Sequence, residues 1–175
     1  MISVIKMFKN IYISLLSPYK RADIFRKEGI KIGKNCSIYN KVSFGSEPYL
    51  IQIGDNVRLT NGVKFITHDG AMWVLRKLGL LDNADLFGQI IIGNNVHIGI
   101  NAIIMPNVTI GDNVIIGVGA IVTKNIPSNS VAAGIPARVI KTIEEYYEKN
   151  KDIVDFTNNM NPKDKKDYLI KKYNL

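Results

Sequence analysis

The sequence contains two histidines, His68 and His97, and one cysteine, Cys36. A neutral imidazole can accept a proton from a hydroxyl group near pH 7, so either histidine could act as a general base. His68 lies in the segment Ile66-Thr67-His68-Asp69, where the neighbouring carboxylate could orient the imidazole or simply face solvent. So few histidines and cysteines rule out a multi-cysteine zinc site and a zinc ion held by three histidines. We therefore predict acid–base chemistry and no metal centre.

The elements that must position these side chains follow a six-residue period. A β-branched aliphatic residue recurs at every sixth position, as Ile92, Ile98, Ile104, Ile110, Ile116 and Val122. Neither a helix nor an alternating strand has this period. Gly, Asn and Asp follow the aliphatic positions and favour tight turns, so each hexad is predicted to form a short strand and a corner. Three hexads then make one triangular coil, and stacked coils make a parallel β-solenoid. Cys36 falls in a buried phase of the repeat, which favours a core residue over a nucleophile.

The repeat is interrupted twice, once between Phe44 and Ile53 and once over about residues 69–89. The second break contains Trp73 and Arg76 and lacks the hexad. Long loops on a rigid scaffold often carry function, although a surface insertion would have the same appearance. His68 stands directly before this loop, which makes it the stronger candidate for the base.

Several segments resemble a known family. Residues 92–96 and 110–114 resemble the hexapeptide repeat of left-handed β-helix acyltransferases. Residues 117–127 and 133–140 resemble the last coil of the galactoside, maltose and NodL-type acetyltransferase branch. The left-handed sense of the coil comes from this resemblance alone, because parallel β crossovers are otherwise right-handed.

The fold class implied is an all-β core formed by a left-handed parallel β-helix, with short N-terminal and C-terminal helices. We expect a helical segment over residues 1–29, with helices at 3–16 and 18–28. The β-helix is expected over 30–141 with its extended loop at 69–89. A helical tail is expected over 142–175, with a last helix near 162–173.

The resemblance implies an acetyl-CoA-dependent O-acetyltransferase that acts on a hydroxyl of a sugar or surface-polysaccharide unit. His68 matches the catalytic histidine of the family and is expected to act as general base in a direct transfer without an acyl-enzyme. His97 stands where related sugar acetyltransferases usually carry Trp, and the sequence leaves open whether it lines the site or faces solvent. Asp69, Trp73 and Arg76 are candidates for orienting the base or contacting the acceptor.

Acetyl-CoA is the co-substrate that this resemblance implies. We expect exposed backbone around three residues to bind the pantetheine arm, namely Gly99, Gly117 and Val118. Three further residues match family positions that contact the cofactor, namely Thr123, Lys124 and Arg138. The two cations among them could pair with the phosphates.

The family resemblance further implies a homotrimer with sites between neighbouring subunits. Two other functions stay open at this point. One is N-acetylation of an amino sugar, or acetylation of serine or a drug, on the same fold. The other is a non-catalytic solenoid that serves as an assembly module.

The net charge of +8 belongs mainly to the start of the chain. Residues 1–35 hold eight basic and two acidic residues, whereas residues 36–140 hold seven and six. The solenoid is therefore nearly neutral, which argues against a nucleic-acid partner. We see no signal peptide and no membrane span, and expect a cytoplasmic protein. Peripheral membrane contact through residues 1–29 is a further expectation.

Overall fold

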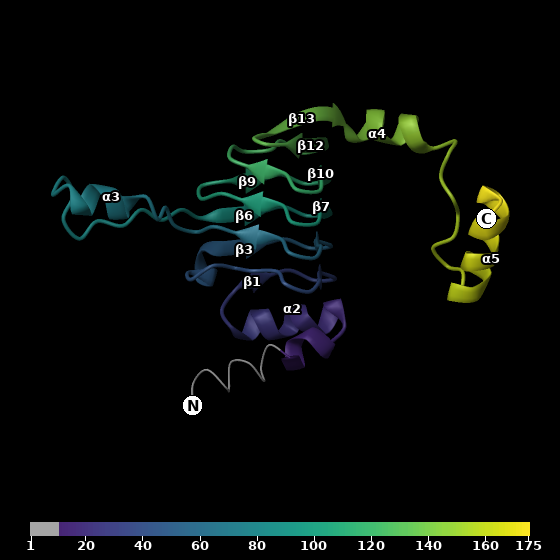
Figure 1. Ribbon diagram of the computed structural model, residues 1–175, viewed down its shortest axis with the longest axis horizontal. Helices are drawn as coiled ribbons and strands as arrows, with labels where there is room; N and C mark the ends of the chain where they lie inside the picture. Colours follow the sequence, from purple (N-terminus) through teal and green to yellow (C-terminus); the bar gives the residue numbers. More distant parts are fainter. Residues whose placement is uncertain (1–10) are drawn as a thin grey trace.

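The computed structural model describes residues 11–175 and shows a three-sided parallel β-solenoid, as the six-residue period predicts (Figure 1). Sheet A stacks β1 (Lys31–Ile32), β3 (Ile51–Ile53), β6 (Ile90–Ile92) and β9 (Thr109–Ile110). Sheet B stacks β2 (Ser37–Ile38), β4 (Arg58–Leu59), β7 (Val96–Ile98), β10 (Val114–Ile116), β12 (Ser130–Gly134) and β13 (Ala137–Thr142). Sheet C stacks β5 (Lys64–Phe65), β8 (Ile103–Ile104) and β11 (Ile121–Val122).

The chain passes through the sheets in the order A, B, C and then returns to A one coil higher. Strands β3, β4 and β5 form what we call the second coil, β6, β7 and β8 the third, and β9, β10 and β11 the fourth. Neighbouring coils pair in parallel register, so that Ile98 lies beside Leu59 below and Ile116 above. Each position of the repeat therefore forms a vertical column along the solenoid.

The interior is filled by the aliphatic residues of the repeat. Ile98, Ile104, Ile110 and Ile116 are all completely buried. Cys36 is buried among them, and burial raises the pKa of its thiol above the ordinary value. A buried thiol that resists ionisation is a poor nucleophile, which agrees with its predicted place in the core.

Asparagines at the corner between sheets A and B hold the coils in register. Asn95 and Asn113 adopt positive φ angles of 54° and 55°, a conformation that suits Asn in tight turns. The Asn95 Nδ2 donates to Asn113 Oδ1 at 2.8 Å, and Asn113 Nδ2 donates to Asn129 Oδ1 at 2.9 Å. The coils approach so closely here that a Cβ on Gly93 would lie 2.7 Å from the carbonyl carbon of Gly111.

Helix α2 (Pro18–Lys27) covers the lower end of the solenoid (Figure 1). The buried guanidinium of Arg21 donates to the carbonyl oxygens of Ile13, Ser14 and Ile38. Arg26 donates to the carbonyls of Ile32 and Gly33 in the first coil. Arg21 thus joins the helical residues 13 and 14 to the edge strand β2, and Arg26 satisfies carbonyls at the end of the edge strand β1.

Part of the helix expected over 3–16 lies outside the described residues. The part that the structure describes is helical at residues 11–15. Within residues 11–175, no helix has the length and apolar character needed to cross a membrane. Membrane contact through residues 1–29 stays a prediction.

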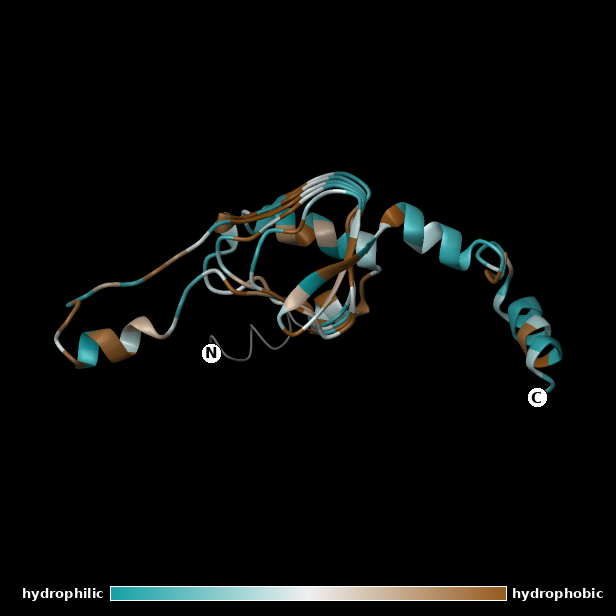
Figure 2. Cartoon of the chain, turned by 90° about the horizontal axis from the view of Figure 1, so that it is seen from above, coloured by the Kyte–Doolittle hydropathy of each residue, from teal (hydrophilic) through white to brown (hydrophobic). Residues whose placement is uncertain are grey.

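The hairpin of β12 and β13 closes the upper end, and α4 (Ile143–Asn150) follows it directly. Helix α5 (Pro162–Tyr173) ends the chain, and the tail extends away from the solenoid (Figures 1 and 2). The Lys172 Nζ and the Tyr168 hydroxyl both donate to Asp155 Oδ1 at 2.6 Å. These bonds fix α5 to the segment that connects it to α4.

Candidate active site

An arm extends from the corner between sheets C and A (Figures 1 and 2). His68, three residues beyond β5, lies at its base, where it forms a β-bridge with Phe87. The arm leaves after β5, carries the short helix α3 (Met72–Lys77) and returns before β6. At its base, Gly88 N donates to the Thr67 oxygen at 2.8 Å and Asp69 N donates to the Leu86 oxygen at 2.8 Å. This short antiparallel contact holds His68 where the chain leaves the rigid coil.

The carboxylate beside His68 belongs to Glu47. Its Oε2 lies 3.3 Å from His68 Nδ1 and accepts hydrogen bonds of 2.8 Å from the hydroxyls of Thr67 and Ser46. The bond from Thr67 is the main reason why the pKa of Glu47 lies below its ordinary value, and Ser46 and His68 contribute further. Glu47 is therefore ionised at neutral pH and can hold the Nδ1 side of the imidazole.

Asp69, a candidate for orienting His68, is engaged elsewhere. Its Oδ1 accepts from the backbone N–H of Ala71 at 2.9 Å, just before α3. Sequence reasoning missed Glu47 because it lies in the irregular insertion between Phe44 and Ile53, far from His68 in the chain. The extra residues that interrupt the repeat there were the signal that could have found it.

Trp73 and Arg76 belong to α3, on the arm that extends away from the solenoid (Figures 1 and 2). Arg76 Nη1 donates to the Ala84 oxygen and, at 2.6 Å, to Asp85 Oδ1, which joins the two sides of the arm. Trp73 is 58% exposed. In the single chain neither residue contacts the candidate base.

The corner that carries His68 also carries two of the cofactor candidates. The register aligns Phe65 with Ile104 and Ile104 with Val122. Thr123 and Lys124 therefore stand on the same corner as His68, two coils higher. Two strand spacings correspond to about 10 Å along the solenoid. We call this set the His68 corner.

The remaining candidates gather on the other side of the solenoid. His97 projects from β7 in sheet B, and Gly99 and Gly117 stack at the corner between sheets B and C. Val118, 72% exposed, stands beside Gly117. Arg138 on β13 pairs with Ala133, which lies above Gly117. We call these five residues the His97 face.

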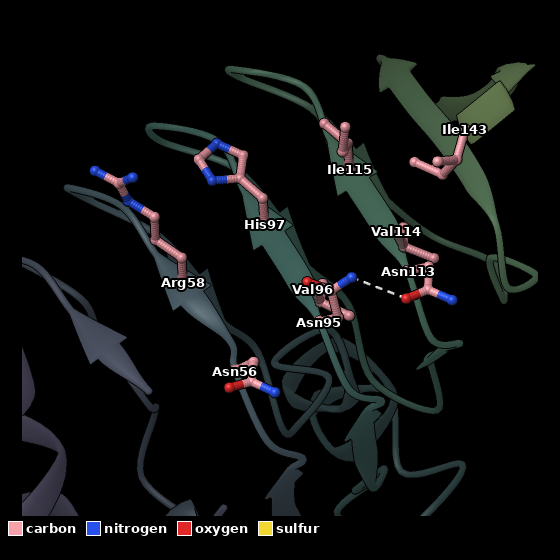
Figure 3. Close-up of a pocket in the computed structure, with 9 residues that line it drawn as sticks. All are labelled: Asn56, Arg58, Asn95, Val96, His97, Asn113, Val114, Ile115 and Ile143. Atoms are coloured by element: carbon pink, nitrogen blue, oxygen red, sulfur yellow. Dashed lines mark hydrogen bonds between the residues drawn. The ribbon is translucent and has the colours of Figure 1, made fainter. Parts of the chain in front are cut away.

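His97 borders an open hollow of about 330 Å³ on sheet B (Figure 3). It lies between Arg58 of β4 and Ile115 of β10, and all three side chains project from the same face. Burial in this hollow, with a smaller effect of the Arg58 charge, holds the pKa of His97 below its ordinary value. The imidazole is therefore neutral at pH 7 and can both donate and accept a hydrogen bond.

One chain does not bring its two histidines together. The corner between sheets C and A lies opposite sheet B in a three-sided solenoid, so the His68 corner and the His97 face are on opposite sides. A site that uses both sets must form between two copies of the chain. Among residues 11–175, no group of three or more His, Cys, Asp or Glu side chains could hold a metal ion.

The stacked hexads are typical of a class of protein, the hexapeptide-repeat transferases. A family described as bacterial transferase hexapeptide (six repeats) matches residues 89–124. Protein CapG of Staphylococcus aureus is 47% identical over 167 residues, which cover 94% of this chain and 96% of that protein. The chain belongs to the hexapeptide-repeat transferase family.

Its relatives include sugar acetyltransferases. The galactoside O-acetyltransferase of Escherichia coli (strain K12) is 46% identical over 127 residues, 69% of this chain and 60% of that protein. A solved structure of galactoside acetyltransferase in complex with coenzyme A matches with a TM-score of 0.61 and 33% identity, over 82% of each chain. The maltose O-acetyltransferase of Clostridium difficile 630 matches with a TM-score of 0.52 and 33% identity, over 76% of this chain and 81% of that chain. These matches confirm the left-handed β-helix and the sugar O-acetyltransferase branch.

Proposed function

We propose that this acetyl-CoA-dependent acetyltransferase moves the acetyl group onto a hydroxyl of a sugar or polysaccharide-precursor unit, with His68 as general base. The observation that carries the proposal is the Glu47 carboxylate 3.3 Å from His68 Nδ1, on a corner that also presents Lys124. The kinship with galactoside and maltose O-acetyltransferases supports a sugar acceptor.

In the proposed reaction Nε2 of His68 takes the proton of the acceptor hydroxyl. The oxygen then attacks the thioester carbonyl carbon and forms the new ester bond. When the tetrahedral intermediate collapses, the carbon–sulfur bond breaks and the leaving thiolate takes the proton from the imidazolium. Glu47 would hold the Nδ1–H and so keep Nε2 free to accept a proton. The buried thiol of Cys36 supplies no nucleophile, which favours direct transfer without an acyl-enzyme.

The cofactor is proposed to lie along the solenoid axis with its phosphates at the upper coils. Thr123, Lys124 and Arg138 are exposed there, and the two cations suit phosphate groups. The level of Lys124 lies about 10 Å above that of His68, so the pantetheine arm would run from the phosphates down toward His68. Backbone around Gly99, Gly117 and Val118 would bind its amides from the facing subunit.

A homotrimer, which the family resemblance implies, is the proposed assembly. An assembly of copies is needed because the His68 corner and the His97 face of one chain lie on opposite sides. Cyclic symmetry would then form three equivalent sites, each from two chains. The arm with Trp73 and Arg76 is proposed to reach the neighbouring subunit.

The function is tested by incubating the enzyme with acetyl-CoA and a panel of sugars and amino sugars while measuring CoA release. The His68→Ala variant is expected to lose about a hundredfold or more in turnover, because it lacks the base. The exposed Lys31→Gln on sheet A is the control and should keep full turnover. Full turnover by His68→Ala would overturn the assignment of the base. Transfer only to amino sugars would favour N-acetylation, and no transfer to any acceptor would favour an assembly module.

A further inference from the structure

Arg58, on β4 of sheet B, is an exposed cation. Its Nη2 donates to the Tyr39 hydroxyl at 2.7 Å, and its guanidinium lies 5.0 Å from the centre of the Tyr39 ring. Among residues 11–175, no carboxylate forms an ion pair with it. The tyrosine holds the guanidinium in place without neutralising it, and several of its N–H donors remain available.

The surroundings of Arg58 suit a polar anion. Arg58 pairs in register with His97 on the next strand, so the two side chains project side by side (Figure 3). The hollow they border contains no acidic residue, and its other polar side chains are the amides of Asn56, Asn95 and Asn113. The amides of Asn95 and Asn113 are engaged in the ladder of the corner, so the guanidinium and the imidazole are the main donors that the hollow offers to a carboxylate or phosphate.

The height of Arg58 along the solenoid separates it from the proposed phosphate end of the cofactor. Arg58 and His68 both belong to the second coil, on β4 and directly beyond β5. Arg138 lies four strands above Arg58 in sheet B, about 19 Å away at the usual strand spacing. In a cyclic assembly whose axis runs along the solenoid, equivalent coils share one height. Arg58 of one subunit would then stand level with His68 of its neighbour, where the acceptor hydroxyl must lie.

From this placement we infer that the acceptor is an anionic sugar unit, and that Arg58 in the sheet B hollow binds its carboxylate or phosphate group. The inference rests on the proposed function, because it places the acceptor between two copies of the chain. The anion could instead come from coenzyme A, if Arg58 bound a phosphate of the cofactor. The acceptor is favoured because Lys124 and Arg138 already stand at the upper coils.

A kinetic experiment separates the two sources. CoA release is measured with p-nitrophenyl glucuronide, which carries a carboxylate, and with the neutral p-nitrophenyl glucoside, for the wild type and for Arg58→Gln. The variant is expected to lose about tenfold or more in kcat/KM with the glucuronide, the size of one charge-assisted hydrogen bond. With the glucoside, and in KM for acetyl-CoA, it should change less than twofold. The control Lys31→Gln removes a charge from sheet A and should leave kcat/KM unchanged with both sugars.

Equal losses with both sugars, or a raised KM for acetyl-CoA, would overturn the inference and leave the proposed function standing. If neither sugar is a substrate, a binding measurement tests whether Arg58 selects an anionic sugar. Glucuronate and glucose are each titrated into the CoA-loaded enzyme while the NMR signals of the Arg58 Nε–H and the His97 ring are followed. We expect glucuronate to shift both signals and glucose to shift them much less. Equal shifts, or none, would show that Arg58 does not select an anion.

Discussion

Glu47 Oε2 lies 3.3 Å from Nδ1 of His68. Glu47 belongs to the first interruption of the repeat, and His68 stands directly before the second. The insertion that carries Glu47 follows the first coil, and the arm that follows His68 leaves from the second. Thr67, completely buried one position before His68, donates to the same Glu47 oxygen at 2.8 Å. The rigid coil thus positions the carboxylate through one hydroxyl and the imidazole through its backbone.

The first prediction concerns Glu47 as a positioning residue. Glu47→Gln removes the charge that holds His68 and should lower kcat about tenfold to a hundredfold, with KM for acetyl-CoA unchanged. Glu47→Asp keeps the charge and should recover part of the loss. The measurement is steady-state CoA release. A rise in KM with an unchanged kcat would instead point to a role in binding.

The second prediction concerns the assembly of the site from two chains. Val118→Trp should block the His97 face, because the large exposed side chain would occupy the space in which the cofactor is proposed to lie. His68→Ala should disable the opposite corner. Each variant is expected to be inactive alone. Random mixed trimers should recover about a quarter of wild-type turnover, since a site is intact only when each chain supplies its unaltered side.

The control for this experiment is a mixture of His68→Ala with His68→Asn, which alters the same corner in every chain and should stay inactive. An absence of recovery in trimers shown to contain both His68→Ala and Val118→Trp would place the whole site within one chain.

The third prediction concerns the titration of His97. Its pKa is lowered by burial and, to a lesser extent, by Arg58. Arg58→Gln should therefore raise the pKa of His97, and Lys31→Gln should not. The His97 ring signal in an NMR pH titration checks this, with His68→Ala to assign the two histidines. An unchanged pKa in Arg58→Gln would mean that the guanidinium does not act on the imidazole.

The fourth prediction follows from the sign of the same shift. Because the pKa of His97 is lower in the folded than in the unfolded chain, the unfolded chain takes up the proton first as the pH falls below about 6.5. The free energy of unfolding should therefore fall in that range and level off below the folded pKa. Replacing the imidazole in His97→Gln should reduce this fall, as measured by urea unfolding between pH 7.5 and 5. If the free energy of unfolding of the variant had the same pH dependence as that of the wild type, the fall could not be assigned to His97.

The fifth prediction concerns the cap at the lower end. Arg21→Met keeps the apolar bulk and removes the donors to three backbone carbonyls, which should lower the free energy of unfolding by about 3 kcal/mol. Lys20→Met, on an exposed neighbour, should change it by less than about 0.5 kcal/mol. Urea unfolding measures the free energy of unfolding of both variants. An equal decrease in the two would show that the hydrogen bonds of Arg21 do not stabilise the lower end of the solenoid.

The sequence by itself determined the coil, its core and the place of His68. The six-residue period specifies which residue points inward at each step, because every hexad contains its own strand and corner. Burial of Ile98, Ile104 and Cys36 could therefore be predicted without long-range contacts. The interruption at residues 69–89 likewise marked His68, since a loop must leave the coil where the repeat fails.

Only the tertiary structure decided which side chains meet. Glu47 replaced Asp69 beside His68 because the geometry of two insertions, which no period describes, brings it there. Arg58 became the neighbour of His97 through the stacking of β4 on β7, and residues far apart in the chain can be paired only once the number of residues per coil is known. The His68 corner and the His97 face lie on opposite sides of the solenoid. In a three-sided coil the corner between sheets C and A lies opposite sheet B. Local patterns specify one coil, and the register between coils assembles the candidate site.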